Sequence, residues 1–276
     1  MKIFPAIPDA NLIRMFFEKT GIKLNFLISY HYLRGQACNL SRYRNLYGLL
    51  YLDSGAFSVA TGKSHITVDE YLRYLNLNGK AFDETFNLDD EFNDPEHNWQ
   101  NQVYLEKNLS RGIKRPIPVL HDSQDPFGEF ETFYSNYDYI AVGSNRKAGD
   151  GFFKKMKAKY SDVKIHMFGN LNRKMLLEHR PYSADSASFA HAVTFGEMYY
   201  WHPGERKEYR LYLGGREKKG NNGIHFNEFE HRKEVEKFLN KVFGYKYQDL
   251  LVSPGTGWIV NFYFMKQIED YINSLP

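Results

Sequence analysis

The stretch LYGLLYLDSG, residues Leu46–Gly55, joins an apolar, β-prone run to a carboxylate and a glycine. Such runs are typical of buried strands, and the polar residue after one marks the end of the strand. Asp53 has two interpretations at this position. It caps the turn that follows, or it is a chemical group held at the mouth of a sheet. The rest of the chain bears on this choice, because the same pattern recurs.

Seven further runs share this pattern, in which a short apolar segment ends at a polar residue or a glycine. They are Lys23–Leu33, Glu84–Glu91, Arg115–Ser123, Asp138–Asn145, Val163–Asn170, Tyr182–Ser188 and Glu208–Gly215. Helix-like stretches lie between them, and strands that alternate with helices predict parallel pairing and right-handed crossovers. Eight units predict an α/β protein with a (β/α)8 barrel of the TIM type. Seven or fewer would favour an open doubly wound sheet.

The helical stretches carry boundary signals of their own. Thr67 with Glu70 three residues later has the spacing of a capping box, and Gly112 predicts the end of the next helix. Residues 227–276 differ from the rest, because they contain two helical stretches and no barrel unit. We expect them to form a helical extension packed on the barrel. No linker rich in Pro, Gly or Ser divides the chain, so we expect one domain over residues 1–276.

Composition limits the classes of function. The chain has 276 residues, of which 42% are hydrophobic, enough for a large core. Its net charge of +3 allows a nucleic-acid partner without requiring one. The single cysteine, Cys38, excludes an internal disulfide and a multi-cysteine metal site. No apolar run approaches the roughly 20 residues that span a bilayer, and no secretion signal is evident. We therefore expect a cytoplasmic protein without a membrane partner.

Acidic side chains fall at the ends of three expected strands. Asp53, Asp89 and Asp185 hold these positions, His121 ends a fourth run, and Asp90 is an equal alternative to Asp89. The carboxyl ends of barrel strands form one face, where active sites lie, so we expect these groups to converge. Paired carboxylates suit glycosyl chemistry, in which one attacks the anomeric carbon and another transfers the proton.

Other chemistries lack their signatures. The sequence has no phosphate-binding loop, no HExxH and no cysteine cluster. His121, Asp122 and Asp89 form an unspecific ligand set, so we expect neither a metal nor a cofactor. The structural alternatives are a capping role for Asp53, a turn role for Asp185, a structural His121 and a core position for Phe57.

Several segments resemble one known family. LDSGAFS (Leu52–Ser58) resembles the DSGG-aromatic element of tRNA-guanine transglycosylases, the queuosine-related transferases. It looks still closer to the short phage and bacterial relatives thought to insert 7-deazaguanine bases into DNA. FNLDDE, PVLHDS, IAVGSN, HMFGN and ADSAS then follow in the order of the family. The resemblance covers about residues 24–201 and implies a base-exchange enzyme of bacteria or phage-infected cells.

The resemblance implies roles for individual residues. Asp185 would be the nucleophile that forms a covalent glycosyl intermediate, and Asp53 the general acid/base. Asp89 would bind the Watson–Crick edge of a guanine-like base, and Phe57 would stack on that base. Further contacts to the base are implied for His121, Gly143, Ser144 and Gly169.

Departures from the family pattern bear on whether the substrate is DNA or tRNA. The tRNA enzymes carry a zinc site of three cysteines and a histidine, which this chain cannot form, and Ser144 stands where the family usually has Glu. These differences favour DNA over tRNA, with a free 7-deazaguanine base as co-substrate. The same chemistry on tRNA, hydrolysis without base insertion, and a non-catalytic nucleic-acid-binding barrel are the alternatives.

Basic loops are expected to contact the nucleic-acid backbone. They follow expected strands and would ring the mouth of the barrel, where phosphates would pass. The residues concerned are Arg146, Lys147, Arg216, Lys218 and Lys219.

Overall fold

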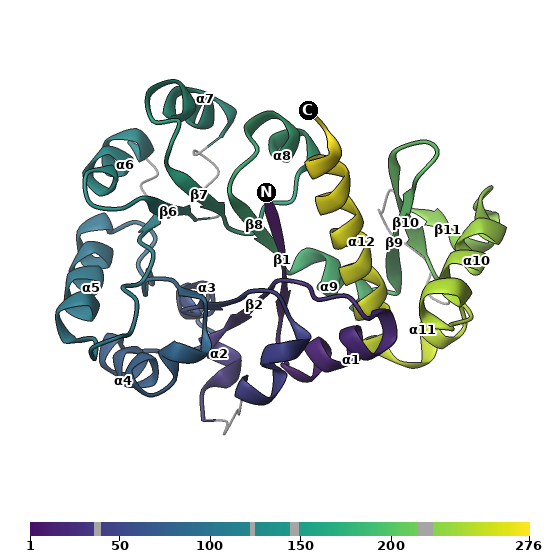
Figure 1. Ribbon diagram of the computed structural model, residues 1–276, viewed down its shortest axis with the longest axis horizontal. Helices are drawn as coiled ribbons and strands as arrows, with labels where there is room; N and C mark the ends of the chain where they lie inside the picture. Colours follow the sequence, from purple (N-terminus) through teal and green to yellow (C-terminus); the bar gives the residue numbers. More distant parts are fainter. Residues whose placement is uncertain (36–39, 122–124, 144–148, 215–222) are drawn as a thin grey trace.

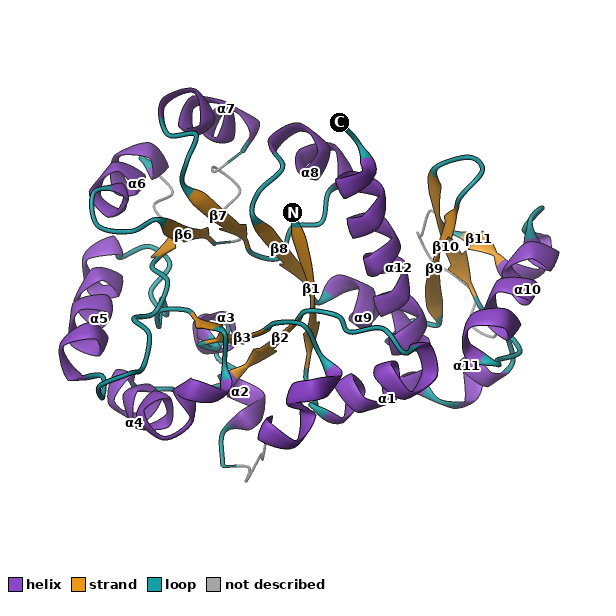
Figure 2. Cartoon of the chain, in the orientation of Figure 1, coloured by secondary structure: helices purple, strands orange, loops and turns teal. Residues whose placement is uncertain are grey.

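The computed structural model describes residues 1–35, 40–121, 125–143, 149–214 and 223–276. Eight parallel strands form one curled sheet in the order β4-β3-β2-β1-β8-β7-β6-β5. These strands are β1 (Lys2–Ile7), β2 (Phe26–Ser29), β3 (Leu50–Asp53), β4 (Glu84–Thr85), β5 (Val119–Leu120), β6 (Tyr139–Val142), β7 (Lys164–Met167) and β8 (Ser183–Ser186). Helices α4 to α8 form an arc outside the strands (Figure 2). The predicted α/β fold of the TIM type is confirmed.

The two edges of this sheet meet between β4 and β5. A parallel bridge joins Phe86 to Ile117, where Asn87 N donates to Ile117 O at 3.0 Å and Ile117 N donates to Thr85 O at 2.8 Å. This bridge links the ends of the sheet into a ring, so the C-terminal ends of all eight strands face one side. We call this side the mouth.

One strand of the barrel differs from the prediction. Seven runs become β2 to β8, but Glu208–Gly215 is not a barrel strand. It contributes β10 (Lys207–Tyr212), which pairs antiparallel with β9 (Glu197–His202) and parallel with β11 (Ile224–His225) in a separate sheet. The eighth barrel strand is β1, which the sequence did not predict. Pro5 interrupts its apolar pattern and Pro8 follows directly after it, and proline usually argues against a central strand.

Twelve α-helices lie among the described residues. They are α1 (Asn11–Thr20), α2 (Tyr30–Leu33), α3 (Ala56–Ala60), α4 (Val68–Asn78), α5 (Pro95–Asn108), α6 (Pro126–Tyr134), α7 (Asp150–Lys159), α8 (Arg173–His179), α9 (Ser188–Thr194), α10 (Arg232–Phe243), α11 (Asp249–Val252) and α12 (Pro254–Ser274), with 3-10 turns at Leu40–Leu46, Gly79–Ala81 and Phe226–Glu228. Among the described residues, no helix is long and apolar enough to cross a membrane.

Two helix boundaries test the predicted signals directly. Thr67 caps α4, because its side chain accepts a hydrogen bond from Glu70 N at 3.2 Å. Gly112 does not cap α5, which already ends at Asn108. Ser110 N donates instead to Asn76 Oδ1 at 2.7 Å, and this bond to α4 draws the chain out of the helix.

The C-terminal helix α12 lies between the barrel and the three-stranded sheet (Figure 1). On the barrel side, Ile3 N of β1 donates to Glu269 Oε2 at 2.5 Å. Asn261 is fully buried. Its Oδ1 accepts from Tyr199 N of β9 at 2.9 Å, and its Nδ2 donates to Phe189 O of α9 at 2.6 Å. α12 therefore packs on the barrel while it carries the small sheet, which α10 covers on its far side (Figure 1).

Candidate active site

Three predicted acids lie close together at the mouth. Asp53 ends β3, Asp89 follows β4, and Asp185 lies in β8. Burial, together with the negative charges of Asp89 and Asp185, raises the pKa of Asp53 to about 7. The Gly55 N–H favours the ionised form and offsets part of this rise. Since charges act on one another at short range, the three carboxylates share one region of the mouth.

Asp53 also holds the turn that follows its strand. Gly55 N donates to Asp53 Oδ2 at 3.2 Å, so the carboxylate binds the turn and titrates near neutrality as well. Gly55 has a φ of 87°, and a Cβ there would come within 2.9 Å of Ile66 Cδ1 and 3.2 Å of His31 N. Only glycine fits this turn without strain. The small residues after Asp53 therefore keep its carboxyl group in place.

Asp185 is held by one of its two oxygens. Gly169, with a φ of 61°, donates its N–H to Asp185 Oδ1 at 2.9 Å. His166 Nε2 lies 3.4 Å from the same oxygen, without the alignment of a hydrogen bond. No described residue donates a hydrogen bond to Oδ2, as far as the described chain extends. This asymmetry distinguishes Oδ2, which accepts no hydrogen bond from the described residues, from Oδ1.

Beneath Asp185, polar groups run into the barrel interior. His166 Nδ1 is 2.6 Å from Ser183 Oγ, which is 2.6 Å from the hydroxyl of Tyr139. His166 and Ser183 are fully buried. If Tyr139 donates to Ser183 and Ser183 to Nδ1, the His166 proton lies on Nε2 and faces the carboxylate. Sequence reasoning missed His166, although a polar residue inside an apolar strand was the signal.

Asp89 and His121 form a buried pair. His121 Nε2 contacts Asp89 Oδ2, and Ser54 Oγ donates to Asp89 Oδ1 at 3.3 Å. Glu129 Oε2 accepts from His121 N at 3.1 Å, and the imidazole stacks on Phe92 with ring centroids 4.4 Å apart. The pair is therefore fixed on several sides and places a rigid polar edge at the mouth.

The neighbouring Asp90 belongs to a different environment. Its Oδ1 accepts from Asn101 Nδ2 at 3.0 Å and lies 3.3 Å from His97 Nε2, both on α5. Asp89, by contrast, interacts with His121 and raises the pKa of Asp53. The ambiguity between the two acids is resolved in favour of Asp89 as the member of the cluster.

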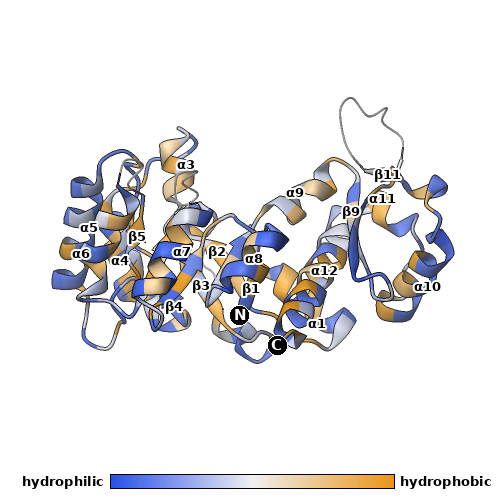
Figure 3. Ribbon diagram, turned by 90° about the horizontal axis from the view of Figure 1, so that it is seen from above, coloured by the Kyte–Doolittle hydropathy of each residue, from blue (hydrophilic) through white to orange (hydrophobic). Residues whose placement is uncertain are grey.

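Of two further predicted base contacts, Gly143 packs against His121 and Phe57 is exposed. A Cβ on Gly143 would lie 2.2 Å from His121 Cε1, so the glycine gives the imidazole its space. Gly143 N donates to Leu120 O at 2.9 Å and is therefore not available to a base carbonyl. Phe57 is 59% exposed on α3, which excludes a core position. Helices α3 and α9 project from the side of the molecule opposite the two termini (Figure 3).

The other predicted contacts lie outside the described residues. They are Ser144, Arg146, Lys147, Arg216, Lys218 and Lys219.

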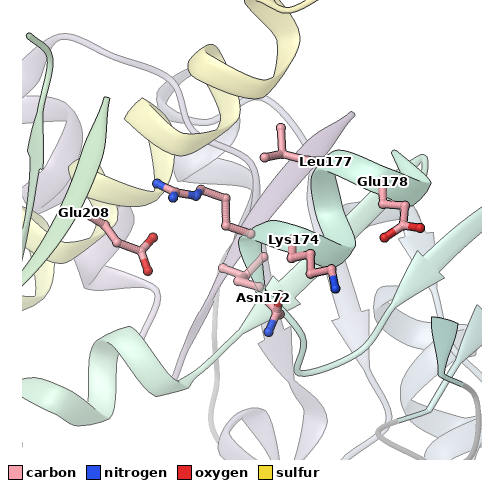
Figure 4. A pocket seen from close by; sticks show the side chains of 7 residues that line it. Asn172, Lys174, Leu177, Glu178 and Glu208 are labelled. Carbon is pink, nitrogen blue, oxygen red and sulfur yellow. The ribbon is translucent and has the colours of Figure 1, made fainter. Parts of the chain in front are cut away.

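A surface groove of about 620 Å³ lies away from these acids, between the start of α8 and β10 (Figure 4). Its lining carries both charges, with two basic residues, Arg173 and Lys174, and two acidic ones, Glu178 and Glu208. The other lining residues are Leu171, Asn172 and Leu177. None of the predicted site residues lines it, so the groove is separate from the cluster at the mouth.

No protein-family model matches the chain, and no curated protein is significantly similar to it. The site must therefore be interpreted from its own chemistry.

Proposed function

We propose that the protein is a base-exchange transglycosylase that replaces guanine in DNA with a 7-deazaguanine derivative. The observation that carries this proposal is the electrostatic coupling of Asp53, with its pKa of about 7, to Asp89 and Asp185. A group with this pKa exists in both protonation states near neutral pH, as a general acid and base must. A second carboxylate nearby, with one free oxygen, supplies a nucleophile.

The first step releases guanine. Asp185 Oδ2 attacks C1′ of the deoxyribose, and the bond from C1′ to the base breaks. The bonding electrons leave with guanine, which takes the proton of Asp53. The sugar is then esterified to Asp185, and Asp53 is ionised. The Gly169 N–H holds Oδ1 at 2.9 Å during this attack.

The second step inserts the new base. The Asp53 carboxylate removes the ring N–H proton of the incoming 7-deazaguanine, and that nitrogen attacks C1′. The ester to Asp185 breaks, which restores both acids to their starting states. Two displacements at one carbon retain its configuration.

Recognition of the base falls to the Asp89–His121 pair. Both Asp89 oxygens already have partners, but each carboxylate oxygen has a second lone pair that can accept from the amine and ring N–H of guanine. The exposed ring of Phe57 supplies an aromatic face for stacking. A base reaches this site from single-stranded DNA or after it is flipped from a duplex.

The decisive experiment combines the full-length chain with single-stranded DNA, duplex DNA or tRNA, each carrying labelled guanine, and a labelled 7-deazaguanine base. We expect guanine release matched by incorporation into DNA, and a denaturant-stable protein–DNA adduct. Incorporation only into tRNA would favour the alternative polymer. Guanine release without incorporation would make the protein a glycosidase. If the chain neither releases guanine nor forms an adduct, the result would favour a non-catalytic nucleic-acid-binding barrel.

A matched pair of variants tests base recognition. Asp89→Asn should raise the KM for the incoming base at least about tenfold, because the amide presents an N–H where an acceptor is needed. Asp90→Asn is the control, since Asp90 is bound to α5. Equal effects of the two substitutions would remove Asp89 from base binding.

A further inference from the structure

Two short segments meet outside the barrel. His202-Pro203-Gly204-Glu205 closes β9 and turns toward β10, and His231 to Glu234 begins α10. The imidazole centroids of His202 and His231 are 4.3 Å apart. We call His202, Glu205, His231 and Glu234 the His–Glu cluster. Each segment contributes one imidazole and one carboxylate, which are metal-ligating groups.

Three members of the cluster present ligand atoms to one point. One atom each of His202, Glu205 and His231 lies within 4.8 Å of the other two. His231 Nε2 is 2.8 Å from Glu205 Oε1. His202 is only 9% exposed, and its buried Nε2 has no hydrogen bond among the described residues, although Glu234 Oε2 lies 3.2 Å away. A buried nitrogen without a partner, beside carboxylates, indicates a site for a ligand.

Neighbouring groups orient these ligands. Tyr209 donates its hydroxyl to Glu205 Oε2, which leaves Oε1 toward the cluster. His231 Nδ1 lies 3.1 Å from Glu234 Oε1, an arrangement that directs His231 Nε2 toward the same point. Carboxylates and hydroxyls commonly hold metal-binding side chains in this way.

We propose that His202 Nε2, Glu205 Oε1 and His231 Nε2 bind a divalent transition-metal ion, best matched by Zn²⁺, with Glu234 orienting His231. Two imidazoles and one carboxylate suit this ion, and a fourth position remains for water. The ion would tie the β9–β10 hairpin to α10 and so stabilise the small sheet. The lack of a cysteine cluster does not bear on this site, because it needs no cysteine.

Binding changes the proton positions. His202 Nδ1 accepts from Glu205 N at 3.0 Å, which places the His202 proton on Nε2. Coordination through Nε2 moves that proton to Nδ1 and gives up one hydrogen bond, a small loss beside the free energy of a metal site. His231 loses any proton on Nε2 to solvent and keeps the one on Nδ1. Affinity should therefore fall as the pH falls.

The test uses the full-length chain without a histidine tag. We expect about one Zn²⁺ per chain after dialysis, a higher melting temperature with Zn²⁺ than with a chelator, and visible absorption bands of tetrahedral Co²⁺ after substitution. The double variant His202→Gln/His231→Gln should lose all three. His65→Gln, at an exposed histidine elsewhere, should keep them.

A second variant covers the case in which the double variant fails to fold. Glu234→Gln removes only the orienting carboxylate of a half-exposed side chain and should weaken Zn²⁺ binding about 10- to 100-fold. No stoichiometric Zn²⁺ in the wild-type chain, or equal losses in His65→Gln, would overturn the proposal. Unchanged affinity in Glu234→Gln would overturn the orienting role.

Discussion

Two clusters in this molecule each combine acids with a histidine, but the pKa of an acid is lowered in one cluster and raised in the other. On the outside, Lys154 Nζ lies 2.7 Å from Asp150 Oδ2 and 2.9 Å from Glu178 Oε1, and His179 Nε2 lies 2.9 Å from Asp150 Oδ1. The hydrogen bond from Lys154 lowers the pKa of Asp150. In the mouth, burial and neighbouring acids raise the pKa of Asp53. The same residue types form a structural ion pair in one place and a titrating group in the other.

The difference comes from burial first and from the presence or absence of a cation second. Among the described residues, no lysine or arginine forms an ion pair with Asp53, Asp89 or Asp185. Without a permanent positive charge, the carboxylates raise one another's energy when they are ionised, and one of them holds its proton to near neutral pH. Such a group is a candidate for catalysis, whereas a neutralised one is not.

The largest expected effect is on the nucleophile. Asp185→Ala should reduce base exchange by at least about 1,000-fold and abolish the covalent DNA adduct, because no other described group replaces Oδ2. Exchange assays and denaturing gels with trapped adduct measure both. Full exchange by this variant would contradict the nucleophile assignment.

Asp53→Asn should lower turnover by about 100- to 10,000-fold, since the amide neither gives nor takes the proton. The adduct can still accumulate if the departing base is protonated by water. In the wild-type protein, the rate of base exchange should change around pH 7, where Asp53 titrates. A pH profile that is the same in both proteins would remove Asp53 from proton transfer.

The same substitution should stabilise the fold at alkaline pH. The folded-state pKa of Asp53, about 7, lies above its ordinary value of 3.8, so the folded state favours the neutral acid. Its contribution to stability is complete below about pH 4 and is lost as the pH rises toward 7. Asp53→Asn should therefore gain up to about 4 kcal/mol over wild type at pH 8 and little at pH 4. Denaturant unfolding at both pH values would test this, and equal differences would contradict it.

His166 is expected to position Asp185 rather than to react. His166→Gln should lower kcat about tenfold with little change in KM, because Oδ1 keeps the Gly169 N–H. Ser183→Ala, which removes the partner of His166 Nδ1, should have a similar but smaller effect. A large rise in KM alone would argue against a positioning role.

The smallest effect is expected outside the mouth. Asp150→Asn breaks an exposed ion pair, and exposed pairs contribute little to stability. Thermal unfolding and base exchange should both match wild type. A loss of exchange in this variant would show that the two acid groups are not as different as their electrostatics indicate.

Local sequence predicted the alternation of strands and helices and the acids at strand ends. These predictions work because the ends of parallel strands meet at one face whatever their spacing along the chain. The Thr67 cap was predictable for a different reason, because a cap is an interaction between residues close together in the sequence. The barrel strand β1 was not predictable, because Pro5 interrupts its pattern and only its pairing with β2 and β8 defines it.

The sequence by itself thus determined the fold class and the residues Asp53, Asp89 and Asp185 as candidates. Only the tertiary structure decided between Asp89 and Asp90, placed His166 beneath Asp185, and moved the last predicted strand to a second sheet. It also brought His202 and His231 together. The physical reason is that burial, charge coupling and ligand geometry depend on neighbours distant in the chain, which no local pattern records.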